Sequence, residues 1–451
     1  ILDYKIYVTL AGINHELNAF ITIHYPNNSP DELSFIWFHL WPNAYLNDQT
    51  AFAKQKLENR STDFYYAKKS ERGFIDKLDF RVNTTTLKTE ADPQNPDITK
   101  LYLDKALKSG ETVVISTPFR VKIPESFSRL GHVGQSYQIT QWYPKPAVYD
   151  QLGWHQMPYL DQGEFYSEYG SFDVSITLPQ NYVVGATGDV QNEEERSFLE
   201  QKVAETQAMS SFDEKDRSFP PSSSTPKTLH YLQKNVHDFG WFADKRFHVL
   251  KEVATLASGK KVDCWAMFTN QEASLWQRGA EYVKRSVEFY SANVGEYPYN
   301  QATALQSALS AGAGMEYPNV TVIGVSGDAK GLDVVITHEV GHNWFYGQLG
   351  SNEREHAWMD EGINSYYEMR YIETYYPEKP KTKASGNIMR TLASMADMGS
   401  ANGRYVTYLL SARRNEDQPI ELHSMDYTNL NYGAIVYQKT AIVFRYLEKY
   451  L

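Results

Sequence analysis

One stretch, residues 331–367, constrains this chain more than any other, and at its centre lies the pentapeptide HEVGH, residues 338–342. Residues four apart on a helix share a face, so His338 and His342 can direct both imidazoles at one metal ion. A catalytic zinc usually takes three protein ligands and keeps a fourth position open. Glu339 would lie beside the metal, where a carboxylate can take a proton from a zinc-bound water. The stretch therefore predicts a helix that supplies two zinc ligands.

The third ligand has to come from further along the chain. A metzincin pattern would require glycine at position 345 and histidine at position 348, where this chain has Phe345 and Gln348. A gluzincin pattern requires instead a glutamate on a following helix. Glu361 follows the second histidine after an 18-residue gap, which is long enough to end one helix, turn and begin another. We predict Glu361 as the third ligand, with Asp360 and Glu368 as the alternative carboxylates.

Composition excludes several other classes of protein. A chain of 451 residues should hold two or three domains, and 22% charged with 42% hydrophobic residues describes a globular protein. The formal charge of -11 argues against a nucleic-acid partner, because neutralising phosphates requires a basic face. The single cysteine, Cys264, excludes an intrachain disulfide and a cysteine zinc cluster.

Targeting signals are absent from the sequence as it stands. No apolar run approaches the roughly 18 residues that indicate a membrane span, and no apolar core of a signal peptide is present. The first residue is Ile1 rather than methionine, and we expect that a leader has been removed or is not included. Our expectation is an exported, periplasmic protein without a membrane span; the sequence predicts no oligomeric state.

The first half of the chain has the pattern of β-strands. Between residues 4 and 179, runs rich in β-branched and aromatic residues are separated by turn-forming residues, and several alternate with period two. These runs are 5–10, 19–25, 33–41, 112–123 and 172–178. They predict an antiparallel sheet or sandwich whose aromatic rings fill the core. The polar segment 191–227 interrupts the pattern and is predicted to be a surface insertion with a flexible end, with a short helix near 198–209.

Helical periodicity takes over in the second half. A helix is predicted over 271–294, a short strand over 320–324, and the zinc-binding helix from about residue 332. We therefore divide the chain into a β-rich domain, 1–245, and a mostly helical zinc domain, 246–451. The segment AGAGMEYPN, residues 311–319, comes shortly before the zinc-binding helix. Its glycines Gly312 and Gly314 would let the backbone approach a ligand, and Glu316 would point into the same cleft.

Together these motifs resemble one known family. Gly314-Met315-Glu316, the HEVGH helix, Glu361 within WMDEG and Tyr437-Gln438-Lys439 occur in the order and spacing of the aminopeptidase N family of gluzincin metallopeptidases, which includes the leukotriene hydrolase/aminopeptidase. In the β-rich half, TQWYP at residues 140–144 looks like the family's Thr-Gln-x-Glu-Pro segment. The resemblance implies a multidomain α+β protein, with an N-terminal antiparallel β-saddle or sandwich domain, then a mostly α thermolysin-like catalytic domain, ending at Leu451 before a C-terminal helical domain.

The resemblance also implies roles in the reaction. Glu339 would be the general base that later returns its proton to the leaving amine. Tyr437 would donate a hydrogen bond to the oxyanion, and its neighbour Tyr432 is the rival for that role. One zinc ion is the implied cofactor.

Substrate-binding residues follow from the same resemblance. Glu316 would grip the free α-ammonium of a peptide, while the backbone at Ala313 and Gly314 would pair with the peptide as an added strand. Gln141 of the TQWYP segment is the remaining substrate-binding candidate. The implied partners are peptides with a free N-terminus.

Two positions depart from the family pattern. Tyr317 stands where the family has an asparagine after the glutamate, and Tyr143 stands where the family usually has a second amine-binding glutamate. Loss of one of two carboxylates should weaken the grip on a charged amino terminus.

The leading hypothesis is a zinc-dependent aminopeptidase that hydrolyses the N-terminal peptide bond through a zinc-activated water. The alternatives are a thermolysin-like endopeptidase and a non-catalytic zinc-binding scaffold protein, because folds can outlive their chemistry.

Overall fold

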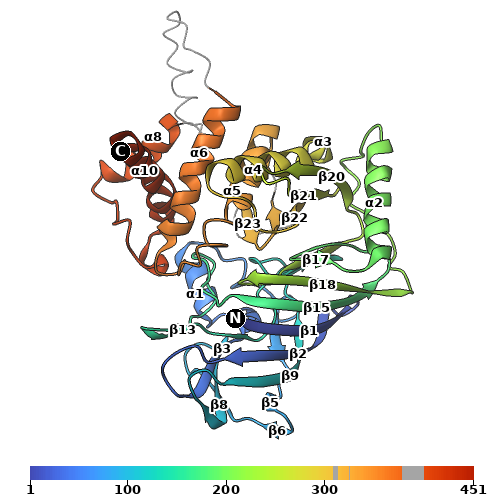
Figure 1. Cartoon of the computed structure of the whole chain (residues 1–451), viewed down its shortest axis with the longest axis vertical. Helices are drawn as coiled ribbons and strands as arrows, with labels where there is room; N and C mark the ends of the chain where they lie inside the picture. The colour runs from blue at the N-terminus through green and yellow to red at the C-terminus, as the bar shows by residue number, and fades with distance from the viewer. Residues whose placement is uncertain (308–312, 325, 378–400) are drawn as a thin grey trace, which may run out of the picture.

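The computed structural model describes residues 1–307, 313–324, 326–377 and 401–451, so Gly312 of the predicted glycine-rich loop lies outside the described residues (Figure 1). Strands of the first half of the chain form the lower part of the molecule in Figure 1, and a second sheet with most of the helices forms the upper part. The segment predicted to bind zinc, residues 331–367, lies in this upper part.

A nine-stranded sheet dominates the β-rich half, in the order β17-β18-β15-β1-β2-β9-β5-β6, with β4 paired to β9. Every second residue of β1 is buried, as expected for a strand with one face on a core. Ile6 of β1 lies opposite Ile21 of the antiparallel β2 and Val174 of the parallel β15. The strands are β1 (Leu2–Ala11), β2 (Glu16–Pro26), β4 (Phe74–Asp76), β5 (Arg81–Val82), β6 (Thr85–Thr86), β9 (Thr112–Lys122), β15 (Gly170–Pro179), β17 (Asp189–Val190) and β18 (Pro226–Val236).

Smaller sheets close the other side of this core, which holds the buried rings of Trp41, Trp142 and Trp241. One sheet joins β12 (Lys145–Pro146), β3 (Leu33–His39), β8 (Ile98–Leu107) and β7 (Thr89–Ala91). Another joins β10 (Gly131–Val133), β11 (Ser136–Ile139), β19 (Trp241–Asp244) and β16 (Val183–Ala186), and a third pairs β13 (Tyr149–Asp150) with β14 (Gly153–Trp154). A 3-10 turn (Trp41–Tyr45) and helix α1 (Ala51–Glu58) follow β3.

The predicted insertion contains a longer helix than expected. Helix α2 (Glu193–Ala208) begins before the predicted start near residue 198, because three glutamates in its first turn complement the helix dipole. Its buried Leu199 and Val203 face the body of the protein, and the Thr206 hydroxyl accepts the Val249 N–H at 3.0 Å. The segment is thus fastened to strand β20 (His248–Thr255) of the next sheet.

A five-stranded sheet begins the second half, in the order β20-β21-β22-β24-β23. Its first strand starts at His248, just beyond the predicted boundary at residue 245. The predicted helix over 271–294 is two helices, because the chain turns at Arg278 and brings Gly279 against Ala266, where an added Cβ would lie 2.9 Å from the alanine Cβ. The elements are β20 (His248–Thr255), β21 (Lys261–Phe268), α3 (Ala273–Trp276), α4 (Gly279–Asn293), β22 (Gln301–Gln306), β23 (Gly314–Tyr317) and β24 (Val320–Ile323).

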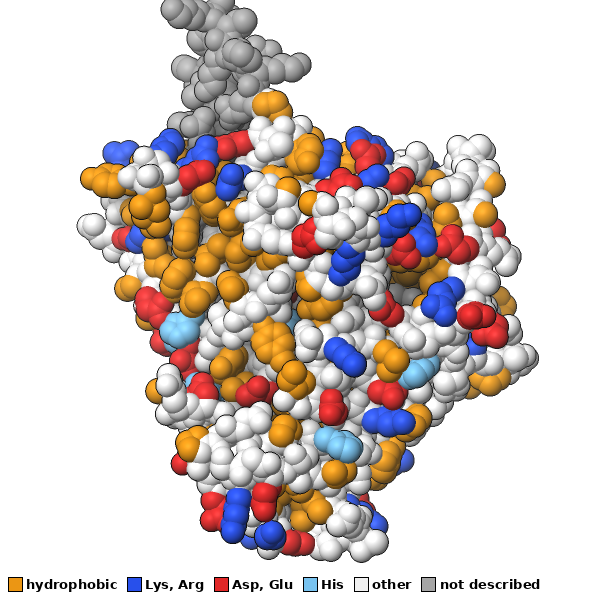
Figure 2. Space-filling model, in the orientation of Figure 1, with side chains coloured by type: hydrophobic (Ala, Val, Ile, Leu, Met, Phe, Trp, Pro, Cys, Tyr) orange, Lys and Arg blue, Asp and Glu red, His pale blue; other side chains and the backbone are white. Residues whose placement is uncertain are grey.

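The elements described after β24 are helices and helical turns, and they confirm the predicted fold class, a β-rich N-terminal part followed by a mostly helical C-terminal part. They are α5 (Ala329–Gly341), a π-helical turn (Trp358–Gly362), α6 (Ile363–Tyr375), α8 (Ala401–Ala412), a 3-10 turn (Ser424–Asp426), α9 (Asn429–Asn431), a π-helix (Tyr432–Lys439) and α10 (Thr440–Tyr450). Within the described residues, no helix has both the length and the apolar character of a membrane span. Helices α8 and α10 expose apolar side chains, among them Leu410, Tyr446 and Leu447, and such side chains gather over these helices in Figure 2.

Candidate metal centre and substrate cavity

Helix α5 carries the two histidines and is held firmly in place. Its first turn is capped by Asp328, whose side chain accepts the Gly331 N–H at 2.8 Å. Near its end, Gly341 lies so close to Tyr290 and Asn364 that an added Cβ would meet the Asn364 Oδ1 at 2.0 Å. Asn364 in turn donates to the His338 carbonyl at 2.7 Å. Close packing at a glycine therefore joins α5 to α6, the helix that follows the third predicted ligand.

The three predicted zinc ligands come together as a compact triangle. Nε2 of His338 lies 3.0 Å from Oε2 of Glu361 and 3.2 Å from Nε2 of His342, which lies 3.3 Å from the same Glu361 oxygen. A zinc ion held tetrahedrally by bonds of about 2.0 to 2.1 Å keeps its ligand atoms about 3.3 to 3.4 Å apart. Three donors of the right type at nearly these separations fit a zinc ion with little rearrangement.

The alternative carboxylates lie behind the imidazoles rather than among the ligands. Nδ1 of His342 lies 2.5 Å from Asp360, and Nδ1 of His338 lies 2.9 Å from Glu368. Each Nδ1–H can therefore donate to a carboxylate, which leaves the Nε2 lone pair free for a metal and fixes the tautomer. Asp360 and Glu368 thus orient the two histidines.

Adjacent carboxylates, Asp360 and Glu361, lie in a π-helical turn, Trp358–Gly362, and contact opposite ring nitrogens of His342. Gly362 permits this turn to pack against the π-helix Tyr432–Lys439, since an added Cβ would lie 2.8 Å from the Val436 carbonyl oxygen. Spacing alone gave no sign of this wider turn.

Helix α8 supports the centre from outside. Arg404 donates to Glu368, and its Nη1 donates to Oε1 of Gln438 at 2.9 Å. This guanidinium therefore links the carboxylate behind His338 to the residue next to Tyr437. No local signal in the sequence could have selected Arg404, because it meets Glu368 only through tertiary packing.

A cavity of about 260 Å³ opens onto the candidate metal centre. Its lining includes His338 and Glu361 together with five other residues predicted for the site, which are Ala313, Gly314, Glu316, Glu339 and Tyr437. The structure thus brings these predicted residues to one space.

Glu339 lies in the cavity with little freedom to move. Gly314 allows this, because a Cβ at that position would come within 2.4 Å of the Glu339 Oε1. The other oxygen, Oε2, is buried without a hydrogen-bond partner among the described residues. Burial raises the pKa of Glu339 to about 7, while the neighbouring His338 and His342 oppose the rise. A carboxylate with a pKa near neutrality can both accept and return a proton.

Strand β23 is the edge strand of its sheet and presents alternate faces to the two halves of the protein. Gly314 and Glu316 line the cavity, and an oxygen of Glu316 lies within 4.8 Å of ligand atoms of Glu339 and His342. Burial, together with like charges nearby, raises the pKa of Glu316 well above its usual range. A cation bound beside Glu316 would stabilise its ionised form and so oppose the effect of burial and of the neighbouring carboxylates on its pKa.

Tyr437 contacts a predicted ligand directly. Its hydroxyl donates to Oε1 of Glu361 at 2.5 Å, and its ring stacks beside that of His338 with centroids 5.9 Å apart. The rival Tyr432 lies behind it, with ring centroids 6.0 Å apart and a buried hydroxyl that has no partner among the described residues. The hydroxyl next to the candidate metal centre is therefore that of Tyr437.

The two departures from the family pattern share one buried cluster, around Asp238 in the interface between the halves. Tyr143 donates to Asp238 Oδ1 at 2.7 Å, and Tyr317 donates to Oε1 of Gln141 at 3.2 Å. The Gln141 amide in turn lies 3.4 Å from Oδ2 of Asp238. Gln141 is not among the residues that line the cavity, so its substrate-binding role remains a prediction without a contact to support it.

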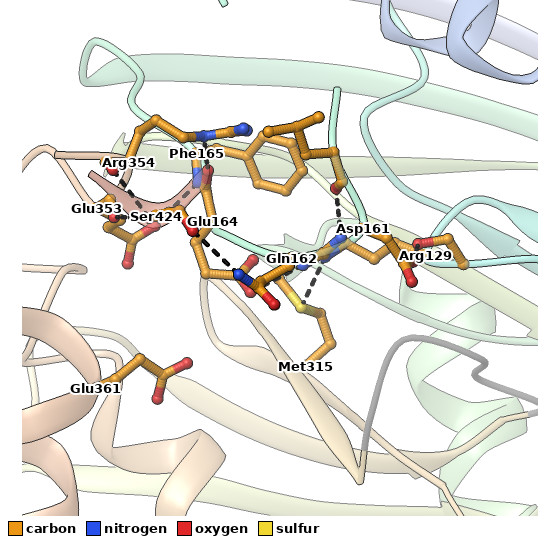
Figure 3. A network of polar contacts seen from close by, with 12 residues as sticks. Arg129, Asp161, Gln162, Glu164, Phe165, Met315, Glu353, Arg354, Glu361 and Ser424 are labelled. Carbon is orange, nitrogen blue, oxygen red and sulfur yellow. Dashed lines mark hydrogen bonds and ion pairs between the residues drawn. The ribbon is translucent and has the colours of Figure 1, made fainter. Parts of the chain in front are cut away.

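Among the charged residues that line the cavity, sequence reasoning missed one. Glu164, from the loop between β14 and β15, lines the cavity opposite the zinc domain and pairs with the buried Arg129 (Figure 3). Neither residue belongs to a recognisable motif.

Comparisons with known proteins agree with this site. Residues 280–451 match the model of the peptidase family M1 domain. The chain is 36% identical over 80 residues to leucine aminopeptidase 2-1 of Meyerozyma guilliermondii, 40% over 62 residues to leucine aminopeptidase 2 of Yarrowia lipolytica, and 33% over 52 residues to human aminopeptidase Q. The matched segments cover 17%, 13% and 12% of this chain but only 13%, 9% and 5% of those relatives.

Solved structures show the same fold over nearly the whole chain. A crystal structure of the M1 zinc metallopeptidase from Deinococcus radiodurans, in a mutant form, matches 99% of this chain and 82% of its own with a TM-score of 0.61 at 14% identity. A second structure, of a two-domain M1 zinc metallopeptidase mutant bound to L-arginine, gives a TM-score of 0.59 and likewise covers 99% of this chain and 82% of its own at 14% identity. The fold and the matched domain are those of M1 peptidases. The predicted resemblance to the aminopeptidase N family of gluzincins is therefore confirmed, and the predicted zinc cofactor agrees with it.

Proposed function

We propose that this chain is a zinc aminopeptidase that hydrolyses the N-terminal peptide bond of peptides. The observation that carries the proposal is that Glu316 lines the same cavity as His338 and Glu361, and that its carboxylate lies within 4.8 Å of a ligand atom of His342, the other member of the set. An anionic side chain at that place can hold the α-ammonium of a substrate while the first peptide bond reaches the metal. The matched relatives named as leucine aminopeptidases support the same reaction.

His338, His342 and Glu361 would hold the zinc ion, with Asp360 and Glu368 fixing the imidazoles from behind. Zinc bound there supplies a Lewis acid that polarises the scissile carbonyl and lowers the pKa of water. The remaining chemistry belongs to side chains of the protein.

Glu339 performs the proton transfers. Its buried carboxylate, with a pKa near 7, takes a proton from the attacking water and delivers it to the nitrogen of the leaving amine. Tyr437 stabilises the negative charge that builds up on the carbonyl oxygen. Its hydroxyl donates to Glu361 in this structure, so the substrate oxygen takes over that hydrogen bond as charge develops.

The edge of β23 orients the peptide. The Gly324 N–H donates to the Ala313 carbonyl at 2.9 Å, so Ala313 pairs with the interior of the sheet. Strand alternation then turns the N–H and C=O of Gly314 toward the outer edge, where an extended peptide can add as a strand. This geometry aligns the amino terminus of the peptide with Glu316.

Substrates with free and blocked amino termini test the proposal. We expect the zinc-loaded protein to cleave leucine arylamide, to lose that activity with a chelator and regain it with zinc, and to act at least about 100-fold less well on the N-acetylated compound. Equal cleavage of both would overturn the exopeptidase assignment and favour the thermolysin-like endopeptidase. A protein that binds zinc but cleaves neither those compounds nor longer peptides would be a scaffold.

A further inference from the structure

Glu164 is a carboxylate of the cavity that the proposed chemistry leaves without a role. It comes from the β-rich half, in the loop between Trp154 and Gly170, yet it lines the same cavity as Glu316. Its side chain is 9% exposed. An acidic group buried at this depth needs partners, because an uncompensated buried charge is costly.

One oxygen of Glu164 is accounted for and the other is not. Oε1 accepts from Nη2 of Arg129 at 2.8 Å, whereas Oε2 is buried with no hydrogen-bond partner among the described residues. A buried carboxylate oxygen left without a donor loses the stability that a hydrogen bond would give. The oxygen can therefore accept a hydrogen bond from a donor that is not part of the described protein, such as a group bound in the cavity that Glu164 lines.

Arg129 fixes the direction of this carboxylate. The guanidinium is itself buried and held on three sides, with Nη1 donating to the Leu160 carbonyl at 3.1 Å and Nε donating to Sδ of Met315 at 3.2 Å (Figure 3). Met315 is the residue between Gly314 and Glu316 in β23, so the same arginine positions both Glu164 and the strand that carries Glu316. Glu361 lies beside this network without joining it in Figure 3.

The charges favour a cation between the two glutamates. Arg129 compensates the charge of Glu164, and the nearby Arg354 donates from Nε to the Glu164 carbonyl at 3.0 Å. Glu316 makes no ion pair among the described residues, and the charge of Glu164 adds to the effects that raise its pKa. A single ammonium group would satisfy the oxygen of Glu164 and neutralise Glu316.

We propose that Glu164 is the second carboxylate that binds the α-ammonium of the substrate, in place of the glutamate that the family pattern expects where this chain has Tyr143. This inference rests on the proposed aminopeptidase function and specifies its amine-binding site. Tyr143 is committed to Asp238 in the domain interface, so the second acid comes from a different loop of the β-rich half. The peptide amino terminus thus lies between the two halves, gripped by Glu316 from one and Glu164 from the other.

The test compares Glu164→Gln with the wild type on the zinc-loaded protein. Glutamine keeps the shape and can still accept from Arg129, but it offers no negative charge. We expect kcat/KM for leucine arylamide to fall about 10- to 100-fold, the loss of one charge-assisted hydrogen bond. Competitive inhibition by leucine amide should weaken by a similar factor, while inhibition by 4-methylpentanamide, which lacks the amine, should change less than about twofold.

Two further variants guard against a merely structural effect. Glu164→Asp keeps the charge and should retain more of the affinity for leucine amide than Glu164→Gln does. Glu195→Gln is the matched control, because Glu195 is also a buried carboxylate, with both oxygens 2.7 Å from Lys227, but lies far from the cavity lining. It should leave kcat/KM unchanged.

Unchanged kcat/KM in the folded Glu164→Gln variant would overturn the inference, and so would equal weakening of inhibition by leucine amide and by 4-methylpentanamide. A loss of kcat/KM confined to arginine arylamide would also overturn it, because Glu164 would then bind a basic side chain of the substrate and not its α-ammonium. A wild-type protein that cleaves no arylamide would instead overturn the proposed function, so the two failures are distinguishable.

Discussion

Tyr437 donates its hydroxyl hydrogen to Oε1 of Glu361 at 2.5 Å, while the other oxygen of that carboxylate faces both imidazoles of the candidate metal centre. One side chain thus connects the ligand set to the cavity. The tyrosine is already next to the place where a substrate carbonyl would bind, and moving its hydrogen bond requires only a small rotation of the hydroxyl.

Replacement of Tyr437 by phenylalanine should therefore lower kcat for leucine arylamide by about 100- to 1,000-fold with little change in KM, because the hydroxyl acts on charge that develops in the transition state. Steady-state kinetics at matched zinc content measure this effect. The matched control is Tyr432→Phe, which removes a hydroxyl that does not line the cavity and should alter kcat by less than about threefold. Equal losses in the two variants would contradict the role given to Tyr437.

Glu339→Gln should keep zinc bound and lower kcat by about 100- to 10,000-fold, since glutamine cannot carry the proton between water and the leaving amine. Metal analysis and arylamide turnover together check this prediction. Near wild-type turnover in a variant with full zinc content would show that the proton transfer does not pass through Glu339.

The carboxylates behind the histidines should control metal affinity. Asp360→Asn and Glu368→Gln are each expected to weaken zinc binding about 10- to 100-fold, because neither amide can hold the Nδ1–H of its histidine as strongly as a carboxylate does. Competition with a chromophoric chelator measures the affinity. Glu373→Gln is the control, because Glu373 lies on α6, as Glu368 does, but pairs with Arg445 at the surface. Unchanged affinity in both inner variants would show that these contacts do not tune the site.

Gly314 should tolerate no side chain. In Gly314→Ala the new Cβ would overlap the Glu339 carboxylate, so we expect at least about a 100-fold loss of kcat/KM, comparable to displacing a catalytic group by about 1 Å. Gly295→Ala provides the comparison, because no atom lies within 4 Å of a Cβ built at Gly295. Wild-type kinetics in Gly314→Ala would mean that Glu339 can move aside without cost.

Buried histidine makes part of the stability depend on pH. Burial lowers the pKa of His39 to about 3, and the nearby Lys145 and Arg354 add to that effect, while its Nε2 accepts the Met157 N–H at 3.1 Å. His39 therefore becomes protonated near pH 6.5 in the unfolded chain but only near pH 3 in the folded protein. Stability from this residue is complete above pH 6.5 and falls by about 1.4 kcal/mol per pH unit below it.

Urea unfolding at pH 7 and pH 5 tests that dependence. His39→Gln, whose amide oxygen can still accept from Met157, should lose about 2 kcal/mol less than the wild type between these two pH values. An identical pH dependence in the two proteins would show that His39 is protonated in the folded state at pH 5.

Local spacing was enough to select the three candidate metal ligands that the structure brings together, because helical geometry acts over a few residues. His338 and His342 lie one helical turn apart, and Glu361 follows His342 after an 18-residue gap that allows the chain to reverse. Their proximity could therefore be predicted without the rest of the fold. The edge strand with Gly314 and Glu316 was likewise visible as a short motif before the zinc helix. The resemblance to the aminopeptidase N family drew Tyr437 into the same site, which no spacing argument could have done among 33 tyrosines.

The sequence by itself therefore determined the chemistry of the centre: two imidazoles, a carboxylate ligand and a neighbouring acid. Only the tertiary structure decided where the other acidic side chains lie relative to the centre and therefore which role each can have. It put Asp360 and Glu368 behind the histidines and turned Tyr143 and Tyr317 into the interface around Asp238. It also brought Glu164 to the cavity, and Arg129 to Glu164, from loops far away in the chain. Such assignments depend on which surfaces pack together, and packing between distant segments leaves no periodic pattern in the sequence for a local reading to detect.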